Sequence, residues 1–205
     1  MKRLSFAGLL LLVFAAGASA QDRMPPLPAA RLTDAQKKAL AEFTANRKTE
    51  PFGPFIAWMR SPEVMTRAMA MGDYLRFKSS LGNKLSEFVI LMISRDWTAQ
   101  YEWHVHEPLA RQAGLDPQIM AAIKDGRRPE RMGEDEQAVY DFCTELIHNQ
   151  YVSDPTYARA LARFGEQGII DMVGIAGYYV FVAMTLNTVR LPLPPGASPQ
   201  LPALP

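Results

Sequence analysis

The chain has 205 residues, of which 48% are hydrophobic and 10% aromatic, a composition typical of a protein with a packed core. Its 22 lysines and arginines nearly balance its 21 aspartates and glutamates, which argues against a nucleic-acid partner, because phosphates are bound by basic patches. A single cysteine excludes an internal disulfide, a CxxC redox pair and a cysteine-rich zinc site.

The first twenty residues have the pattern of a secretory signal peptide. A basic start (residues 1–3) precedes an apolar run (residues 4–17), and small residues follow at 18–20. The run is shorter than the roughly 20 residues that span a membrane, although an uncleaved anchor is the alternative. We therefore expect cleavage after Ala20 and a secreted or periplasmic protein that has no membrane contact after cleavage.

Residues 21–32 are proline-rich and are expected to form an extended lead-in to a domain at 33–190. Thr33 followed by Gln36 is a capping-box pattern and predicts a helix through about Asn46. Residues 50–59 contain two prolines and one glycine, so we expect a loop there that packs its aromatic side chains.

Further helices are indicated by proline in a first turn, by glycine after a last turn and by apolar residues at helical spacing. In chain order they are expected at 62–79, 85–97, 99–113, 117–124, 134–149, 155–164 and 167–187. Thr98 is the expected N-cap of the helix at 99–113, and Asp116 that of the helix at 117–124. No strand-like alternation of useful length occurs, so the predicted fold class is all-α with about seven to eight helices.

The last expected helix is nearly all apolar between Met172 and Leu186. It could span a membrane, but Asp171 and the pair Tyr178-Tyr179 favour a core helix or a subunit interface, and the run is short for a comfortable span. Residues 191–205 form a proline-rich tail without helical potential.

The polar residues with most chemical interest lie in the helix at 99–113. Glu102 and His106 are four residues apart and therefore share one helix face, which is otherwise largely apolar. His104 lies about 200° around the helix from His106, so the two imidazoles diverge. This divergence disfavours a metal site, and we expect none.

Glu87 is the second unusual residue, because it precedes an apolar stretch at 88–93. It is either a solvated acid in the first turn of its helix or a buried proton donor close to His106. Cys143 repeats the apolar face of its own helix and is expected in the core with an unreactive thiol.

Three stretches of the chain resemble the carboxymuconolactone decarboxylase family, whose all-helical fold is shared with the alkylhydroperoxidase AhpD. They are Glu87 to Ile93, the run Tyr101-Glu102-Trp103-x-x-His106-Glu107-Pro108-Leu109-Ala110, and Gly174-x-x-Gly177-Tyr178 in the last helix. The similarity extends over roughly residues 51–195. The resemblance implies an AhpD-like helical fold.

The family includes peroxidases and decarboxylases, and this sequence differs from the peroxidase branch at the positions of its catalytic cysteines. In the peroxidase branch an acid, a CxxC pair and a histidine form a proton relay, and Glu87 and His106 match the acid and the histidine. The two cysteine positions fall on Ala99 and Glu102, and disulfide exchange cannot run without thiols. The resemblance therefore implies the decarboxylase branch, which releases CO₂ from a small carboxylated lactone without a cofactor.

That branch implies roles for particular residues here. His106 would donate the proton to the substrate. Glu102 would orient the His106 imidazole or return a proton to it, and Glu87 would assist. Tyr101 and Trp103 would line the substrate pocket, with plain packing as their alternative role. Arg95 is the candidate for holding the substrate carboxylate.

Two other functions remain open at this stage. The first is a non-catalytic or ligand-binding protein that keeps the pocket of the fold. The second is a thiol peroxidase, which requires Cys143 to approach the pocket. The apolar last helix and the habit of the family imply a homo-oligomer, a trimer or hexamer by analogy.

Overall fold

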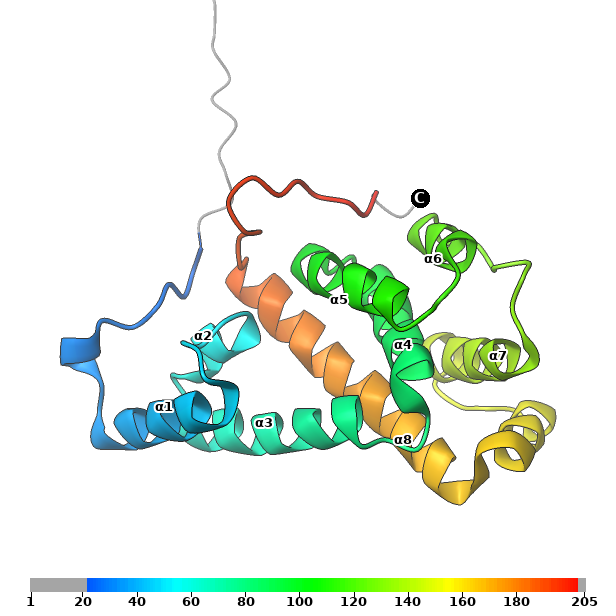
Figure 1. Ribbon diagram of the computed structural model, residues 1–205, viewed down its shortest axis with the longest axis horizontal. Helices are drawn as coiled ribbons and strands as arrows, with labels where there is room; N and C mark the ends of the chain where they lie inside the picture. The colour runs from blue at the N-terminus through cyan, green and yellow to red at the C-terminus, as the bar shows by residue number, and fades with distance from the viewer. Residues whose placement is uncertain (1–21, 203–205) are drawn as a thin grey trace, which may run out of the picture.

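The computed structural model describes residues 22–202, and this part of the chain is all-helical with no strand (Figure 1). The predicted all-α class is confirmed, whereas the expected signal peptide and the last three residues lie outside the described range. A short 3₁₀ helix, η1 (Ala29–Arg31), precedes eight α-helices. These are α1 (Asp34–Arg47), α2 (Pro54–Trp58), α3 (Pro62–Phe77), α4 (Gly82–Asp96), α5 (Gln100–Gln112), α6 (Pro117–Lys124), α7 (Glu134–Asn149) and α8 (Asp154–Val189).

Helix α4 is the centre of the fold. Every residue from Leu85 to Arg95 is buried, because α5, α6, α7 and α8 all pack around this helix. Figure 1 shows the long α8 crossing the molecule beside it. A helix buried on all sides is normally apolar all round, so the polar residues that α4 carries inward are exceptional, and they include Glu87, Ser94 and Arg95.

Two predicted helix starts are confirmed, and one is wrong. The capping box of α1 is formed, with Thr33 and Gln36 exchanging hydrogen bonds, and the Asp116 side chain accepts a hydrogen bond from the Gln118 N–H at the start of α6. Thr98 does not cap α5, whose N-cap is Ala99. The short turn between α4 and α5 instead puts Thr98 in the left-handed region with φ 46°.

Two predicted boundaries need correction. Residues 50–59 contain the short helix α2 rather than only a loop, because Pro54 occupies its first turn, where proline is compatible with a helix. Helix α4 begins at Gly82, three residues before the predicted start. The predicted break between the last two helices is present, because α8 is kinked at Gly165, whose φ of 66° and ψ of −179° form a non-helical conformation that glycine adopts readily.

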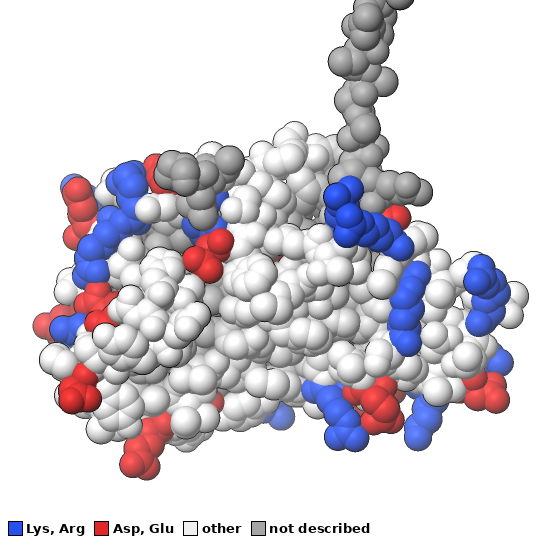
Figure 2. All heavy atoms as spheres, turned by 180° about the vertical axis from the view of Figure 1, so that it is seen from behind, with Lys and Arg blue, Asp and Glu red and all other residues white. Residues whose placement is uncertain are grey.

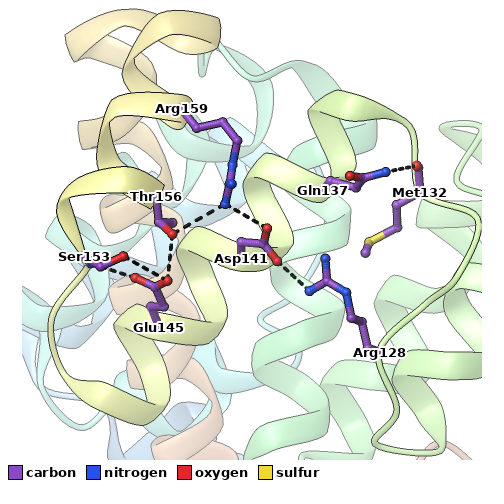
Figure 3. A network of polar contacts seen from close by, with 8 residues as sticks. All are labelled: Arg128, Met132, Gln137, Asp141, Glu145, Ser153, Thr156 and Arg159. Carbon is purple, nitrogen blue, oxygen red and sulfur yellow. Dashed lines mark hydrogen bonds and ion pairs between the residues drawn. The ribbon is translucent and has the colours of Figure 1, made fainter.

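A network of polar contacts fixes the junction between α7 and α8 (Figure 3). Glu145 accepts hydrogen bonds from the Ser153 N–H at 2.7 Å, the Ser153 hydroxyl at 3.2 Å and the Thr156 hydroxyl at 2.7 Å. Arg159 donates to Asp141 at 2.9 Å. The hydrogen bond from the Ser153 backbone is the main reason that the pKa of Glu145 is lowered.

The expected core position of the last helix agrees with the structure. Within the described residues, α8 is the one helix long and apolar enough to cross a membrane, but 56% of its most apolar stretch is buried inside the protein. It also exposes Ile170, Val173, Phe181 and Met184, which recur at helical spacing.

Figure 2 shows that the face opposite to the view of Figure 1 carries its charged side chains mainly near the edges.

Candidate functional site

The packing of α5 against α4 joins Glu87 to His106. Glu87 Oε2 lies 2.7 Å from His106 Nδ1, and both side chains are buried. A carboxylate in this position holds the imidazole proton on Nδ1, which leaves the lone pair on Nε2. Burial lowers the pKa of His106 more than the Glu87 contact raises it, so the imidazole is neutral at pH 7.

Glu102 lies one turn before His106 on α5 and is the most deeply buried acid of the site, with 2% of its surface exposed. The Ser94 hydroxyl donates to its Oε1 at 2.9 Å, whereas Oε2 is buried and has no hydrogen-bond partner. Burial raises the pKa of Glu102 well above its ordinary value, and the Ser94 hydrogen bond offsets this only in part. Burial therefore favours the protonated form of this carboxyl group.

Glu102 and His106 line one pocket of about 70 Å³. Its walls come from α1, α3, α5 and α8 and from the start of α2. Two arginines, Arg47 and Arg76, also line it, and each has a buried Nε without a partner. Because a guanidinium keeps its charge and offers a fork of donors, this pair suits a carboxylate-bearing ligand.

Each of the two arginines has a carboxylate partner. Arg47 forms an ion pair with Asp73, and Arg76 lies 3.9 Å from the Glu87 carboxylate. Glu87 thus lies between a cation and the imidazole of His106.

Two tyrosines of α8 complete the inner wall. Burial raises the pKa of Tyr178 to about 12 and that of Tyr179 well above its ordinary value, so both phenols stay protonated and can donate hydrogen bonds. The Tyr179 ring contacts His106 edge-on, with ring centroids 5.1 Å apart. Gly72 makes room for Tyr178, because a Cβ there would lie 2.4 Å from the phenol oxygen.

The structure brings some predicted site residues together and separates others. Glu87 contacts His106, and Tyr101, Glu102 and His106 line one pocket, whereas Glu87 lines a neighbouring one. Trp103 does not line the pocket and is 1% exposed in the core. Arg95 lies at the far end of α4 and lines a different pocket, between α4, α6 and α7.

The acid in direct contact with His106 is Glu87 rather than Glu102. Arg47, Arg76, Tyr178 and Tyr179 were not anticipated from the sequence. Both arginines lie in the last turns of their helices, where a basic residue is ordinarily a surface group beside the helix dipole, so their residue types and positions gave no signal.

Thiol and metal chemistry have little support in the described residues. Cys143 is fully buried in α7 and is absent from the pocket lining, and burial raises its pKa to about 12. His104 does not line the pocket either. Residues 22–202 contain no group of three or more histidine, cysteine, aspartate or glutamate side chains that could hold a metal ion.

No protein-family model and no curated protein matches the sequence, whereas several solved structures share its fold. An alkylhydroperoxidase AhpD core protein from Ralstonia eutropha JMP134, described as an uncharacterized peroxidase-related protein, superposes with a TM-score of 0.69 at 16% identity, covering 84% of this chain and 92% of its own. An uncharacterized peroxidase-related protein from Silicibacter sp. TM1040 gives 0.65 at 16% identity, covering 85% and 93%.

A third solved structure, of the debrominase Bmp8 in complex with 2,3,4-tribromopyrrole, superposes with a TM-score of 0.65 at 11% identity and covers 86% of this chain and 94% of its own. At these identities the likeness concerns the fold. The chain has the AhpD-like helical fold, as expected from the sequence.

Proposed function

We propose that the protein is a cofactor-independent acid–base enzyme of the carboxymuconolactone decarboxylase type, which releases CO₂ from a small carboxylated lactone. The observation that carries this proposal is Glu102, a buried carboxyl group that has an unpartnered oxygen in a pocket shared with a neutral imidazole and two arginines. A protein that only stabilises its fold gains nothing from an unpartnered carboxyl group, since burying one costs free energy.

The residues of the pocket supply each requirement of such a reaction. Arg47 and Arg76 orient the substrate through its negative charge. When the bond to the carboxylate breaks, CO₂ leaves, and the electron pair moves into the conjugated lactone carbonyl to give a dienolate. The Tyr178 and Tyr179 phenols donate hydrogen bonds to the developing oxyanion.

The proton that replaces CO₂ on carbon comes from Glu102. This transfer leaves a buried carboxylate, which must be protonated again before the next turnover. His106 is the neighbouring base: its Nε2 takes a proton from water and passes it on, while Glu87 keeps Nδ1 protonated. One proton is consumed for each CO₂ released, so no redox partner is needed.

The sequence supports this chemistry over peroxide reduction. Ala99 and Glu102 occupy the two cysteine positions of the peroxidase relay, and Cys143 is buried outside the pocket. The structural neighbour that binds 2,3,4-tribromopyrrole indicates that this fold can hold a small ring compound. A five-membered lactone has a comparable ring size.

The test is CO₂ release from a series of five-membered unsaturated lactones that carry carboxylates. We expect turnover by the wild type, and a loss of about a hundredfold or more in the variant His106→Gln. The matched control is His104→Gln, two residues away on the same helix but outside the pocket. If lactones bind without turnover, or if His106→Gln is as active as the control, the enzyme proposal is wrong, and the first outcome identifies a ligand-binding protein.

We also propose that the protein is exported and self-associates. Export follows from residues 1–20 and is tested by the N-terminal residue of the protein recovered outside the cytoplasm, which should be Gln21. Self-association as a trimer or hexamer is supported by the exposed apolar residues of α8. Native mass spectrometry should show a smaller assembly for Ile170→Lys, since Ile170 is 67% exposed in one chain.

A further inference from the structure

Arg95 is a buried cation that forms no direct ion pair with the described residues. Its exposed fraction is 5%, and the carboxylate that acts on its charge, Asp125, does so without an ion-pair contact. Its Nη1 donates to the Pro202 carbonyl at 2.6 Å, and its Nε is buried without a partner. A guanidinium has five N–H donors, and a buried charge is costly unless it is paired.

The described part of the C-terminal tail, which ends at Pro202, supplies Arg95 with a carbonyl but with no negative charge. Gln100 already holds the tail, because its Nε2 donates to the Leu201 carbonyl at 2.7 Å and its Oε1 accepts from the Gln200 and Leu201 N–H groups at 2.8 and 3.0 Å. Leu201 is buried as well. A neutral side chain at position 95 would leave these contacts in place, so the guanidinium points to an anionic partner.

A pocket of about 130 Å³ lies beside Arg95, between α4, α6 and α7. Its apolar wall consists of Met92, Ile123, Tyr140 and Ile147. Charged groups also line it: Asp96 lies 3.2 Å from His148, and Arg127 pairs with Asp125 at 2.9 Å. The pocket therefore combines an apolar body with a charged rim, on which Arg95 is the arginine that has no ion-pair contact with the described residues.

We infer that this pocket is a second binding site, distinct from the pocket of His106, and that it takes a small organic acid whose carboxylate pairs with Arg95 and whose apolar part lies against Met92, Ile123 and Ile147. A carboxylate matches the fork of guanidinium donors in two parallel hydrogen bonds. The inference does not rest on the proposed function, since no residue of this pocket takes part in the decarboxylation.

The test is a calorimetric titration of the purified protein with benzoate. Because the pocket of Arg47 and Arg76 also suits anions, the titration is made in an Arg76→Gln background. We expect one benzoate per chain, with an affinity at least tenfold higher than that of benzamide, the neutral analogue. Adding Arg95→Gln should weaken benzoate binding at least tenfold, whereas Arg111→Gln, at an exposed position on α5, should leave it within twofold.

A second variant keeps the test decisive if Arg95→Gln does not fold. Ile147→Trp fills the pocket from α7 while leaving Arg95 in place, and it should also weaken benzoate binding at least tenfold. The inference is overturned if benzoate does not bind in the Arg76→Gln background, if benzamide binds equally well, or if folded protein carrying Arg95→Gln or Ile147→Trp binds benzoate like the control.

Discussion

Glu145 and Glu102 are both helical glutamates, but their surroundings shift the pKa of the carboxyl group in opposite directions. Glu145, at the junction of α7 and α8, accepts three hydrogen bonds from Ser153 and Thr156 (Figure 3). Its pKa is lowered, chiefly by the Ser153 backbone N–H. Glu102 accepts one hydrogen bond, from Ser94, and is 2% exposed, and burial raises its pKa well above the ordinary value.

The difference lies in the number of donors that each carboxyl group meets. At the junction the donors stabilise the charged form, so Glu145 joins two helices as a carboxylate. In the pocket, the loss of hydration outweighs one hydroxyl donor, so the protonated form of Glu102 is favoured. The first arrangement contributes to stability, whereas the second leaves a polar atom unsatisfied and makes a proton available for chemistry.

The largest effect should follow from removing the proton of Glu102. In Glu102→Gln the side chain keeps its size but cannot donate a proton to carbon, and we expect kcat for CO₂ release to fall by about 10²–10⁴. The control is Glu107→Gln, on the same helix, where Glu107 pairs with Arg111 near the surface. Equal activity of the two variants would show that Glu102 does not supply the proton.

A smaller effect should separate binding from chemistry. In Arg76→Met the pocket loses one of its two cations, and we expect KM to rise about tenfold, which corresponds to about 1.4 kcal/mol of binding free energy, with a lesser change in kcat. Arg67→Met is the control, because Arg67 lies on the same helix and pairs with Glu63 at the surface. Steady-state kinetics over a range of lactone concentrations decide between an effect on KM and one on kcat alone.

The raised pKa of Glu102 should make the free energy of unfolding decrease as the pH rises. Because its pKa is raised on folding, the folded chain holds a proton that the unfolded chain releases near pH 4.5. Stability is therefore highest below that pH with respect to this group, and it falls by up to about 1.4 kcal/mol per pH unit until the folded-state pKa is passed.

The variant Glu102→Gln lacks the titrating carboxyl group and therefore lacks this pH-dependent contribution to stability. Its free energy of unfolding should fall less than that of the wild type between pH 4.5 and 7.5, measured by urea denaturation at a series of pH values. Glu107→Gln again serves as the control. Parallel curves for wild type and Glu102→Gln would mean that the buried carboxyl group ionises normally.

Much of the fold could be predicted because helix signals are local. The capping box at Thr33, the Asp116 cap and the span of α7 depend on residues within a few positions of one another. The break at Gly165 was predicted for the same reason. The turn at Thr98 was missed, because it is decided by how α5 packs against α4, which the spacing of neighbouring residues does not record.

The site was predictable only where one helix face carried it. Glu102 and His106 are four residues apart, so their common face follows from helix geometry. The contact of Glu87 with His106 depends on how α4 packs against α5, and sequence left open whether Glu87 was solvated. Arg47, Arg76 and the tyrosines of α8 come from distant segments, and Arg95 was assigned to the wrong pocket because its position along α4 cannot be judged without the packing of α6 and α7.

The smallest effect should be that of Glu145 on the pH dependence of stability. The lowered pKa of Glu145 means that its hydrogen bonds stabilise the protein above the unfolded-state pKa, and that this stabilisation is lost as the pH falls through the folded-state value. Glu145→Gln should therefore unfold more easily than wild type at pH 7, while the two converge in acid. Glu42→Gln, at an exposed position on α1, should follow the wild type throughout. The opposite slope from that of Glu102 is the decisive feature, because a general loss of stability on replacing a glutamate would shift both curves in the same direction at every pH.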